Sequence, residues 1–274
     1  MFGSNLNYES EVFVDGYNLT GVSSVSINAR QSSSVISPVG TTRGCTLVSG
    51  PPTQTMSLSR SLIYKDPVLE YVGVKDKPLK AGILNLEDET FYGFESGYIK
   101  DYTVNCAVGT APKVSVNLNV LDEIKSIPAL SSDKRVHEIV EVPTQGSISV
   151  SSEDFETNRV IGFDYSINID QKLIYTVGST NPTSTILLNT KNYAATVQIE
   201  LEKSFGGGSF DFLRSRGKSE IELTIRGRRD RLIESLSIPN ASLISTSVTQ
   251  SAEGVSKLTL GYIGHDGDGG EYLP

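Results

Sequence analysis

One stretch of the chain resembles a phosphate-binding loop. Gly217-Lys218-Ser219 has the form of the end of such a loop, in which glycines expose backbone N–H groups and the lysine reaches the terminal phosphates. The motif also requires a glycine five residues before Gly217, and Phe212 stands there. Residues 220–225 are expected to form a strand, where the motif needs a helix. The departures from the motif therefore argue against a nucleotide site of this type.

The acidic and cysteine residues lack the spacing of a metal site. Residues 266–270 begin like a calcium-binding loop, but Gly270 stands where the third oxygen ligand is required. Cys45 and Cys106 form no CxxC pair and have no histidine at zinc-ligand spacing. We therefore expect no metal and interpret both cysteines as buried thiols, since free cysteine behaves as a small hydrophobe.

Groups suited to acid–base catalysis are equally isolated. His137 and His265 have no companion at a spacing useful for a nucleophile or a proton relay. The carboxylates of residues 87–89 precede an aromatic strand and are typical of a solvated turn. The sequence thus predicts no catalytic or cofactor-binding residue and no cofactor, and we expect that the protein is not an enzyme.

A local excess of basic residues is the feature that remains for a binding role. Its members are Arg214, Arg216, Lys218, Arg226, Arg228, Arg229 and Arg231. They could form a solvated face with local ion pairs, contact an acidic neighbouring subunit, or contact DNA. Charged patches of this kind fix register and partner choice at subunit contacts, so these seven residues are our candidates for a subunit interface.

The elements that must position these residues are strands. Segments rich in Val, Ile, Thr, Ser and Tyr, several alternating apolar with polar, predict strands. They cover residues 21–30, 53–60, 97–108, 113–121, 145–150, 160–169, 184–188, 194–201 and 256–263. Turns are predicted at residues 50–52, 206–208 and 266–270.

Helix is scarce. Asp66 as N-cap with Pro67 at the first helical position predicts a short helix, and residues 230–235 predict a single turn.

The two halves of the chain share landmarks in the same order. Ser26-Ile27-Asn28 recurs as Ser166-Ile167-Asn168. Each triplet is followed by a Val-Gly pair. Near the end of each half, residues 98–116 align without gaps with residues 242–260, which sets Val104 opposite Val248. This pattern predicts an internal duplication, with domains at residues 1–137 and 138–274, and the alternative is chance similarity within one large β fold.

Charge and hydropathy limit which partners and which cellular compartment the sequence favours. The formal net charge is −8 and the pI near 4.9, which argues against a tight grip on nucleic acid, because phosphate binding depends on Lys and Arg. The first residues lack the pattern of a secretory signal, and no segment approaches the length of an apolar membrane span. We expect a protein made in a cytoplasm that has no membrane partner.

The strand pair in the first half resembles strands of phage tail tube and tail structural proteins. The resemblance is carried by residues 97–109, Ala111-Pro112 and residues 114–116, with a weaker counterpart at 241–263. It implies a mainly β fold of two tandem β-sandwich or β-barrel-like tail-tube domains, each with at most a short helix.

For function, the resemblance implies a structural protein of the virion, assembled in the host cytoplasm. Tube domains of this family close in sixes into rings, which stack around a channel, so a duplicated chain would form a ring from three copies. Partners would be further copies of the chain and other tail proteins such as the sheath, terminator, baseplate or tape measure, and DNA would pass without specific binding. Loops at residues 31–52 and 205–218 are expected to form the contacts between rings.

Two other interpretations remain open. A baseplate hub or distal tail protein fits the duplication equally well, because the two halves differ in charge. A β-sandwich surface-binding module, such as an adhesin or carbohydrate-binding domain, is the alternative outside the tail. The absence of Trp is unfavourable for a site that stacks on sugars.

Overall fold

The structure is a computed structural model, and it describes residues 10–36, 46–74, 78–85, 90–127, 141–153, 155–176, 182, 184–201, 219–250 and 256–266. Two segments lie in short 3-10 helices, η1 (Pro67–Tyr71) and η3 (Arg228–Asp230), and no α-helix occurs among the described residues. The remaining regular structure is antiparallel β. The prediction of a mainly β protein is confirmed.

The strands of the first half are β1 (Ser10–Val14), β2 (Tyr17–Leu19), β3 (Val22–Ile36), β4 (Thr46–Ser61), β5 (Leu79–Asn85), β6 (Thr90–Ala107), β7 (Lys113–Val120) and β8 (Lys125–Ile127). Those of the second half are β9 (Ile148–Ser151), β10 (Glu156–Thr157), β11 (Val160–Ile174), β12 (Ser184–Leu201), β13 (Ser219–Arg226), β14 (Leu232–Gln250) and β15 (Ser256–His265).

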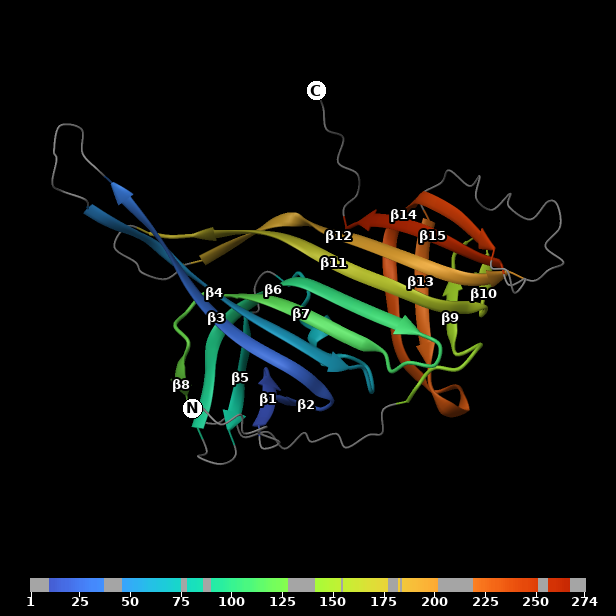
Figure 1. The fold of residues 1–274 in the computed structure, drawn as a ribbon, viewed down its shortest axis with the longest axis horizontal. Helices are drawn as coiled ribbons and strands as arrows, with labels where there is room; N and C mark the ends of the chain where they lie inside the picture. The colour runs from blue at the N-terminus through green and yellow to red at the C-terminus, as the bar shows by residue number, and fades with distance from the viewer. Residues whose placement is uncertain are drawn as a thin grey trace, which may run out of the picture.

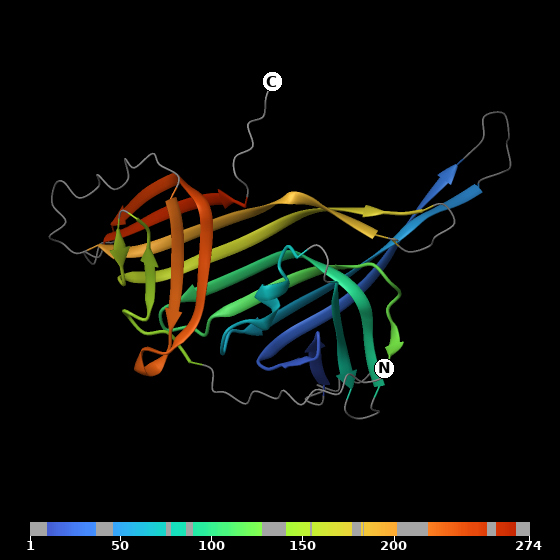
Figure 2. The ribbon, with the colours of Figure 1, turned by 180° about the vertical axis from the view of Figure 1, so that it is seen from behind.

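All fifteen strands belong to one hydrogen-bonded sheet. Eight long strands run in the order β3-β4-β7-β6-β11-β12-β15-β14, as Figure 1 shows. Strands β6 and β14 bend, so that their first parts leave the long strands and pair with β5 and β13. The short strands, β1, β2 and β5 in one half and β9, β10 and β13 in the other, cross the long strands steeply (Figures 1 and 2).

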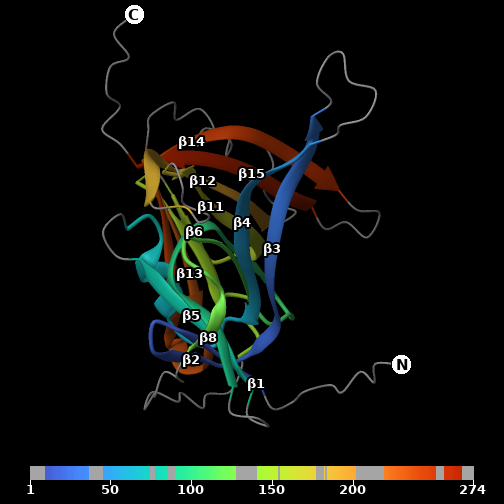
Figure 3. The same cartoon turned by 90° about the vertical axis from the view of Figure 1, so that its left-hand side faces the viewer.

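The core lies on the face of the long strands that the short strands cover. In β7 the side chains alternate, with Val114, Val116, Leu118 and Val120 all at most 2% exposed and polar residues between them. Most of the buried apolar side chains of both halves form a single continuous cluster. Viewed end-on, β5 and β13 lie on the same side of the long strands (Figure 3). Period-two alternation thus decides which face of each strand is buried.

The same order and register of strands occurs twice. Strands β6 and β7 pair Val104 with Val114, and β14 and β15 pair Val248 with Leu258, which is the alignment that the sequence suggested. Bulges interrupt β6 at residues 99–101 and β14 at residues 243–245, which are corresponding positions. By the same comparison β1 corresponds to β9, β2 to β10, β3 to β11, β4 to β12 and β5 to β13. The division into two domains at 137/138 stays a prediction, because residues 128–140 lie outside those described.

The Ser-Ile-Asn triplets are not structural equivalents. Val22 in β3 pairs with Arg60, and Val160 in β11 pairs with Ile199, each beside a bulge one residue later. This register sets Ser26 against Asp164, so the two triplets are displaced by two positions. The displacement keeps the same residues on the same face, because strand side chains repeat every two residues.

Three local predictions were wrong, at residues 50–52, at residues 230–235 and in the expected loop at residues 31–52. Residues 50–52, predicted as a turn, continue β4 into a two-stranded extension with β3 that lies beyond the end of β7. Prolines are tolerated there because a strand paired on one side leaves alternate N–H groups unpaired. The single helical turn predicted at residues 230–235 is also displaced, since η3 covers Arg228–Asp230 and the chain is already in β14 from Leu232.

Residues 31–36 and 46–52, expected as part of a loop, are likewise strand. Residues 206–208 and 267–270 lie outside the described part of the chain.

Local residue chemistry explains two elements, the β1–β2 turn and the start of η1. Asp15 and Gly16 both have positive φ between the paired residues Val14 and Tyr17, as a two-residue hairpin turn of this kind requires. The predicted N-cap is confirmed, since the Asp66 carboxylate accepts a hydrogen bond of 2.8 Å from the Val68 N–H at the start of η1.

Candidate functional site

The joint between the halves is a strand pair, β6 with β11. On the buried face Cys106 lies opposite Phe163, and Val104 lies opposite Tyr165. On the outer face Asn105 donates a hydrogen bond to the Asp164 carboxylate, and Asn168 donates one of 2.6 Å to Asp101. The joint therefore combines apolar burial on one face with amide–carboxylate pairs on the other.

A buried ionic cluster lies in the first half, and it also contacts the second. Arg60 and Asp66 are both 0% exposed, and their side chains form an ion pair with Nη2 2.5 Å from Oδ1. The Tyr102 hydroxyl donates to Asp66 at 3.0 Å, and the backbone N–H of Asp66 donates to Glu234 of β14 at 2.7 Å. Glu234 is 3% exposed. Removing one partner of such a buried pair leaves a charge without compensation, so the cluster fixes its neighbours in place.

Burial shifts the pKa of two members of this cluster. Desolvation raises the pKa of Glu234, while hydrogen bonds from the backbone of Asp66 and Ser235 oppose the rise. The pKa of Tyr102 is raised well above its ordinary value, first by desolvation and then by the nearby carboxylates of Asp66 and Glu234. The tyrosine therefore stays a neutral hydrogen-bond donor to Asp66.

The outer ends of the long-strand sheet are two open edges. Strand β3 pairs only with β4, and residues 242–250 of β14 pair only with β15. In these two strands Ser26, Asn28, Ser247 and Thr249 are exposed. No strand in the described part of the chain pairs with their outer sides. Each edge therefore presents a row of backbone N–H and C=O groups to whatever lies beside it.

The edges have few of the devices that keep edge strands apart, and the irregularities of β3 lie at residues 22–24 and 31–33, on either side of a regular stretch. Strand β3 has a single charged residue, Arg30, in its fifteen residues, and residues 242–250 of β14 have none. Neither segment contains proline. The bulge at residues 243–245 interrupts only the start of the β14 edge. Long uncharged edges of this kind invite pairing with another strand.

Exposed apolar side chains mark the β14 edge. Val248 is 54% exposed, whereas its counterpart Val104 in β6 is 1% exposed. Ile244, at the bulge, is 60% exposed. An edge with these side chains is suited to contact with another protein surface. We take β3 and residues 242–250 of β14 together as the candidate site and call them the open edges.

The basic residues predicted for a subunit interface are distributed differently. Arg214, Arg216 and Lys218 lie outside the described residues, as does the side chain of Arg229. Arg226 forms a partly exposed ion pair of 3.7 Å with Asp230. Arg231 lies 3.8 Å from Glu141, which also accepts a hydrogen bond from the backbone N–H of Arg228. The described members thus contact Asp230 and Glu141, which lies in the segment that connects the two halves, and their role in assembly stays a prediction.

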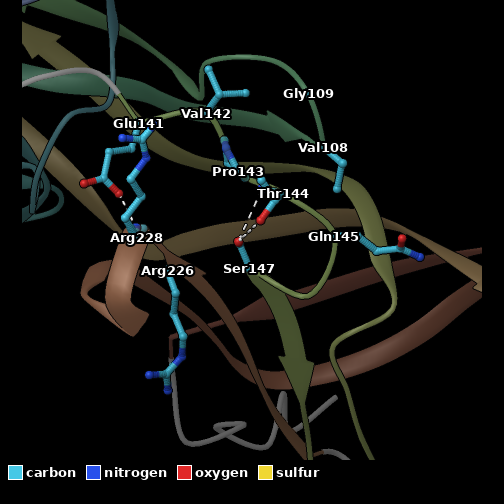
Figure 4. A pocket seen from close by; sticks show the side chains of 11 residues that line it. Val108, Gly109, Glu141, Val142, Pro143, Thr144, Gln145, Ser147, Arg226 and Arg228 are labelled. Atoms are coloured by element: carbon cyan, nitrogen blue, oxygen red, sulfur yellow. Dashed lines mark hydrogen bonds between the residues drawn. The ribbon is translucent and has the colours of Figure 1, made fainter.

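A pocket of about 550 Å³ lies beside this segment (Figure 4). It is formed by the β6–β7 turn, residues 141–147 and the end of β13. Backbone hydrogen bonds join Gly109 N–H to the Pro143 carbonyl and Arg226 N–H to the Ser147 carbonyl. Figure 4 also shows the hydrogen bond between the Thr144 and Ser147 hydroxyl groups, whose oxygens are 2.9 Å apart. These contacts attach the connecting segment to both halves.

The other residues that the sequence singled out for possible chemistry either have a structural place or lie outside the described part of the chain. Residues 219–226 form β13, so the strand predicted after the phosphate-loop pattern is confirmed. Cys106 is buried, as predicted, and burial raises the pKa of its thiol to about 12. His265 ends β15 and is half-buried. Cys45, His137 and residues 87–89 are not among the described residues.

The described part of the chain lacks two further features. No group of three or more His, Cys, Asp or Glu side chains there is placed to hold a metal ion. No helix in that part has the length and apolar character needed to cross a membrane.

Sequence reasoning missed the open edges and the buried cluster. The signal for the β14 edge is its uncharged sequence, but that pattern alone does not distinguish an edge from an interior strand. Arg60 stands in an alternating strand between serines, with no local sign of full burial. No protein-family model and no curated protein matches the chain.

Proposed function

We propose that the protein is a structural subunit of a phage tail, which self-associates through its open edges into rings that stack as a tube around a channel for DNA. The observation that carries the proposal is the repeated strand order. Strands that pair inside the chain, β6 with β11, correspond to strands that end the sheet, β14 and β3. A chain with such ends can extend its sheet by adding copies of itself.

A ring is the favoured arrangement for physical reasons. The contact between β14 and β3 would be head-to-tail, and such contacts generate closed rings or open filaments. Closure would pair both open edges of the long-strand sheet, which removes these two sites of uncontrolled strand pairing. Three copies of a duplicated chain would place six units of corresponding strand order around the ring, as the resemblance to tail tube proteins implies.

The net charge of −8 supports a channel for DNA in preference to a DNA-binding surface. Like-charge repulsion would keep passing DNA from adhering to the wall.

The test is negative-stain electron microscopy of the purified protein over a concentration series, with symmetry analysis of the particles. We expect rings or tubes with a central channel and three-fold symmetry. Monomers that persist at high concentration would reject the proposal and favour a surface-binding module.

A further inference from the structure

We infer that the partner of the β14 edge is β3 of a second copy, paired in the same antiparallel register that joins β6 to β11 within the chain. The inference deepens the proposed function, on which it rests, by naming the partner strand and the residues that lie opposite one another. It follows from the correspondence of four strands, two of which are already paired.

The register can be transferred position by position. Within the chain Val104 lies opposite Tyr165, and Thr103 lies opposite Ser166. Val104 corresponds to Val248 through their pairings with Val114 and Leu258. Tyr165 corresponds to Ile27, because each lies at the same place in its hairpin with β12 or β4.

The transfer gives six opposed pairs between copies within the described residues. They begin with Ser26 opposite Thr249 and continue with Ile27 opposite Val248, Asn28 opposite Ser247, Ala29 opposite Thr246, and Arg30 opposite Ser245, and a sixth pair, Val25 with Gln250, precedes them.

The side chains in these pairs are compatible with contact. Ile27 is half-buried and packs against the core, and Val248 is 54% exposed, so the pairing would cover an apolar side chain beside another. On the opposite face hydroxyl and amide side chains would meet, as Asn and Asp side chains meet in the internal joint. No pair sets like charges opposite one another, an arrangement that would be destabilising.

A second copy is the occupant that fits best. A foreign strand could satisfy one edge, but the chain supplies both complementary edges, with the pairing geometry already formed once inside it. Strands β3 and β14 lie at opposite ends of the long-strand sheet, so they cannot pair with each other within one copy (Figure 1).

Cysteine cross-linking tests the register. The double variant Asn28→Cys/Ser247→Cys and the neighbouring Ile27→Cys/Val248→Cys place thiols at directly opposed positions. Opposed residues in antiparallel strands have Cα atoms about 4.5–5.5 Å apart, within disulfide range. The matched control, Asn28→Cys/Thr249→Cys, is two residues out of register, at about 7–8 Å. All three are made with Cys45→Ser, and Cys106 is kept because it is buried.

After mild oxidation of the folded full-length protein, we expect most of each in-register variant to form covalent oligomers. The control should form no such cross-link. Mixing the two single variants of a pair should yield covalent dimers only. Two pairs on opposite faces are used so that a folding defect at one position does not remove the test. Circular dichroism checks the fold of each variant.

The outcomes separate the inference from the proposed function. Rings seen by microscopy without in-register cross-links would overturn the register and leave the ring proposal standing. In-register cross-links in open chains that never close would support the inferred joint and reject the ring. Monomers without cross-links at high concentration would overturn both.

Discussion

Val104 and Val248 hold corresponding places in β6 and β14, yet their surroundings differ. At Val104 the neighbouring strand β11 is present, Tyr165 lies opposite, and the valine is 1% exposed. At Val248 no described strand pairs with the outer side of β14, and the valine side chain is 54% exposed. The difference teaches that the neighbour, and not the residue type, decides burial at this position.

The internal joint also has support that the open edges lack. Glu234 of the second half accepts a hydrogen bond from Asp66 of the first, within a buried cluster around Arg60. At the corresponding positions of the second half, Ile199 stands for Arg60 and the exposed Thr246 stands for Tyr102. The internal joint therefore forms as the chain folds, whereas the proposed association through the open edges would be a separate, concentration-dependent step.

The largest expected effect comes from breaking the buried cluster. Asp66→Ala leaves the Arg60 guanidinium buried without its carboxylate, which should lower the free energy of unfolding by about 3–5 kcal/mol. Glu70→Ala, which breaks the exposed Lys65–Glu70 pair, should cost less than about 1 kcal/mol. Urea denaturation measures both. Equal losses in the two variants would show that the cluster does not stabilise the fold.

The matched valines test the comparison directly. Val104→Ala should cost about 2 kcal/mol of stability, because two buried methyl groups are lost and a cavity remains. Val248→Ala should change the stability of the monomer by less than about 0.5 kcal/mol but weaken self-association. Denaturation of dilute protein and sedimentation of concentrated protein separate the two effects. A large loss for Val248→Ala in the dilute monomer would contradict the assignment of an open edge.

A smaller effect is expected from the pH dependence of Glu234. Its folded pKa is raised above the ordinary value of 4.5, so the folded chain holds this proton more tightly than the unfolded chain does. The associated stability is present below the unfolded pKa and is lost as pH rises through the folded pKa. Glu234→Gln removes this titration, so wild type should lose stability relative to the variant as pH rises from 4. Parallel stability curves from pH 4 to 8 would refute the expectation.

The smallest effect on folding is expected from the basic residues. Replacing Arg226, Arg228 and Arg229 by Glu should change stability by less than about 1 kcal/mol, since the Arg226–Asp230 pair is largely exposed. The same variant should assemble less well if these residues contact an acidic neighbour.

A charge-matched control uses three exposed lysines, Lys65→Glu, Lys80→Glu and Lys125→Glu. Assembly impaired equally in both triple variants would indicate a general charge effect, and unimpaired assembly of the arginine variant would reject the interface role.

The sequence by itself determined most of the long strands and the first helix, but not the short strands β1, β2, β5, β8 and β10. Alternation placed Val114, Val116, Leu118 and Val120 on one buried face, and Asp66-Pro67 marked the start of η1. It also aligned β6–β7 with β14–β15 in the observed register. These features depend on side-chain period and on local hydrogen bonding, which neighbouring residues specify.

Only the tertiary structure decided which strands lie side by side. The pairing of β6 with β11, the two-residue displacement of the Ser-Ile-Asn triplets, and the continuation of β4 through Pro51 and Pro52 all depend on partners distant in the chain. The burial of Arg60 likewise requires Asp66 beside it and strands on either side. A strand's pattern specifies its two faces but not its neighbours, because backbone hydrogen bonds between strands are the same whatever the side chains.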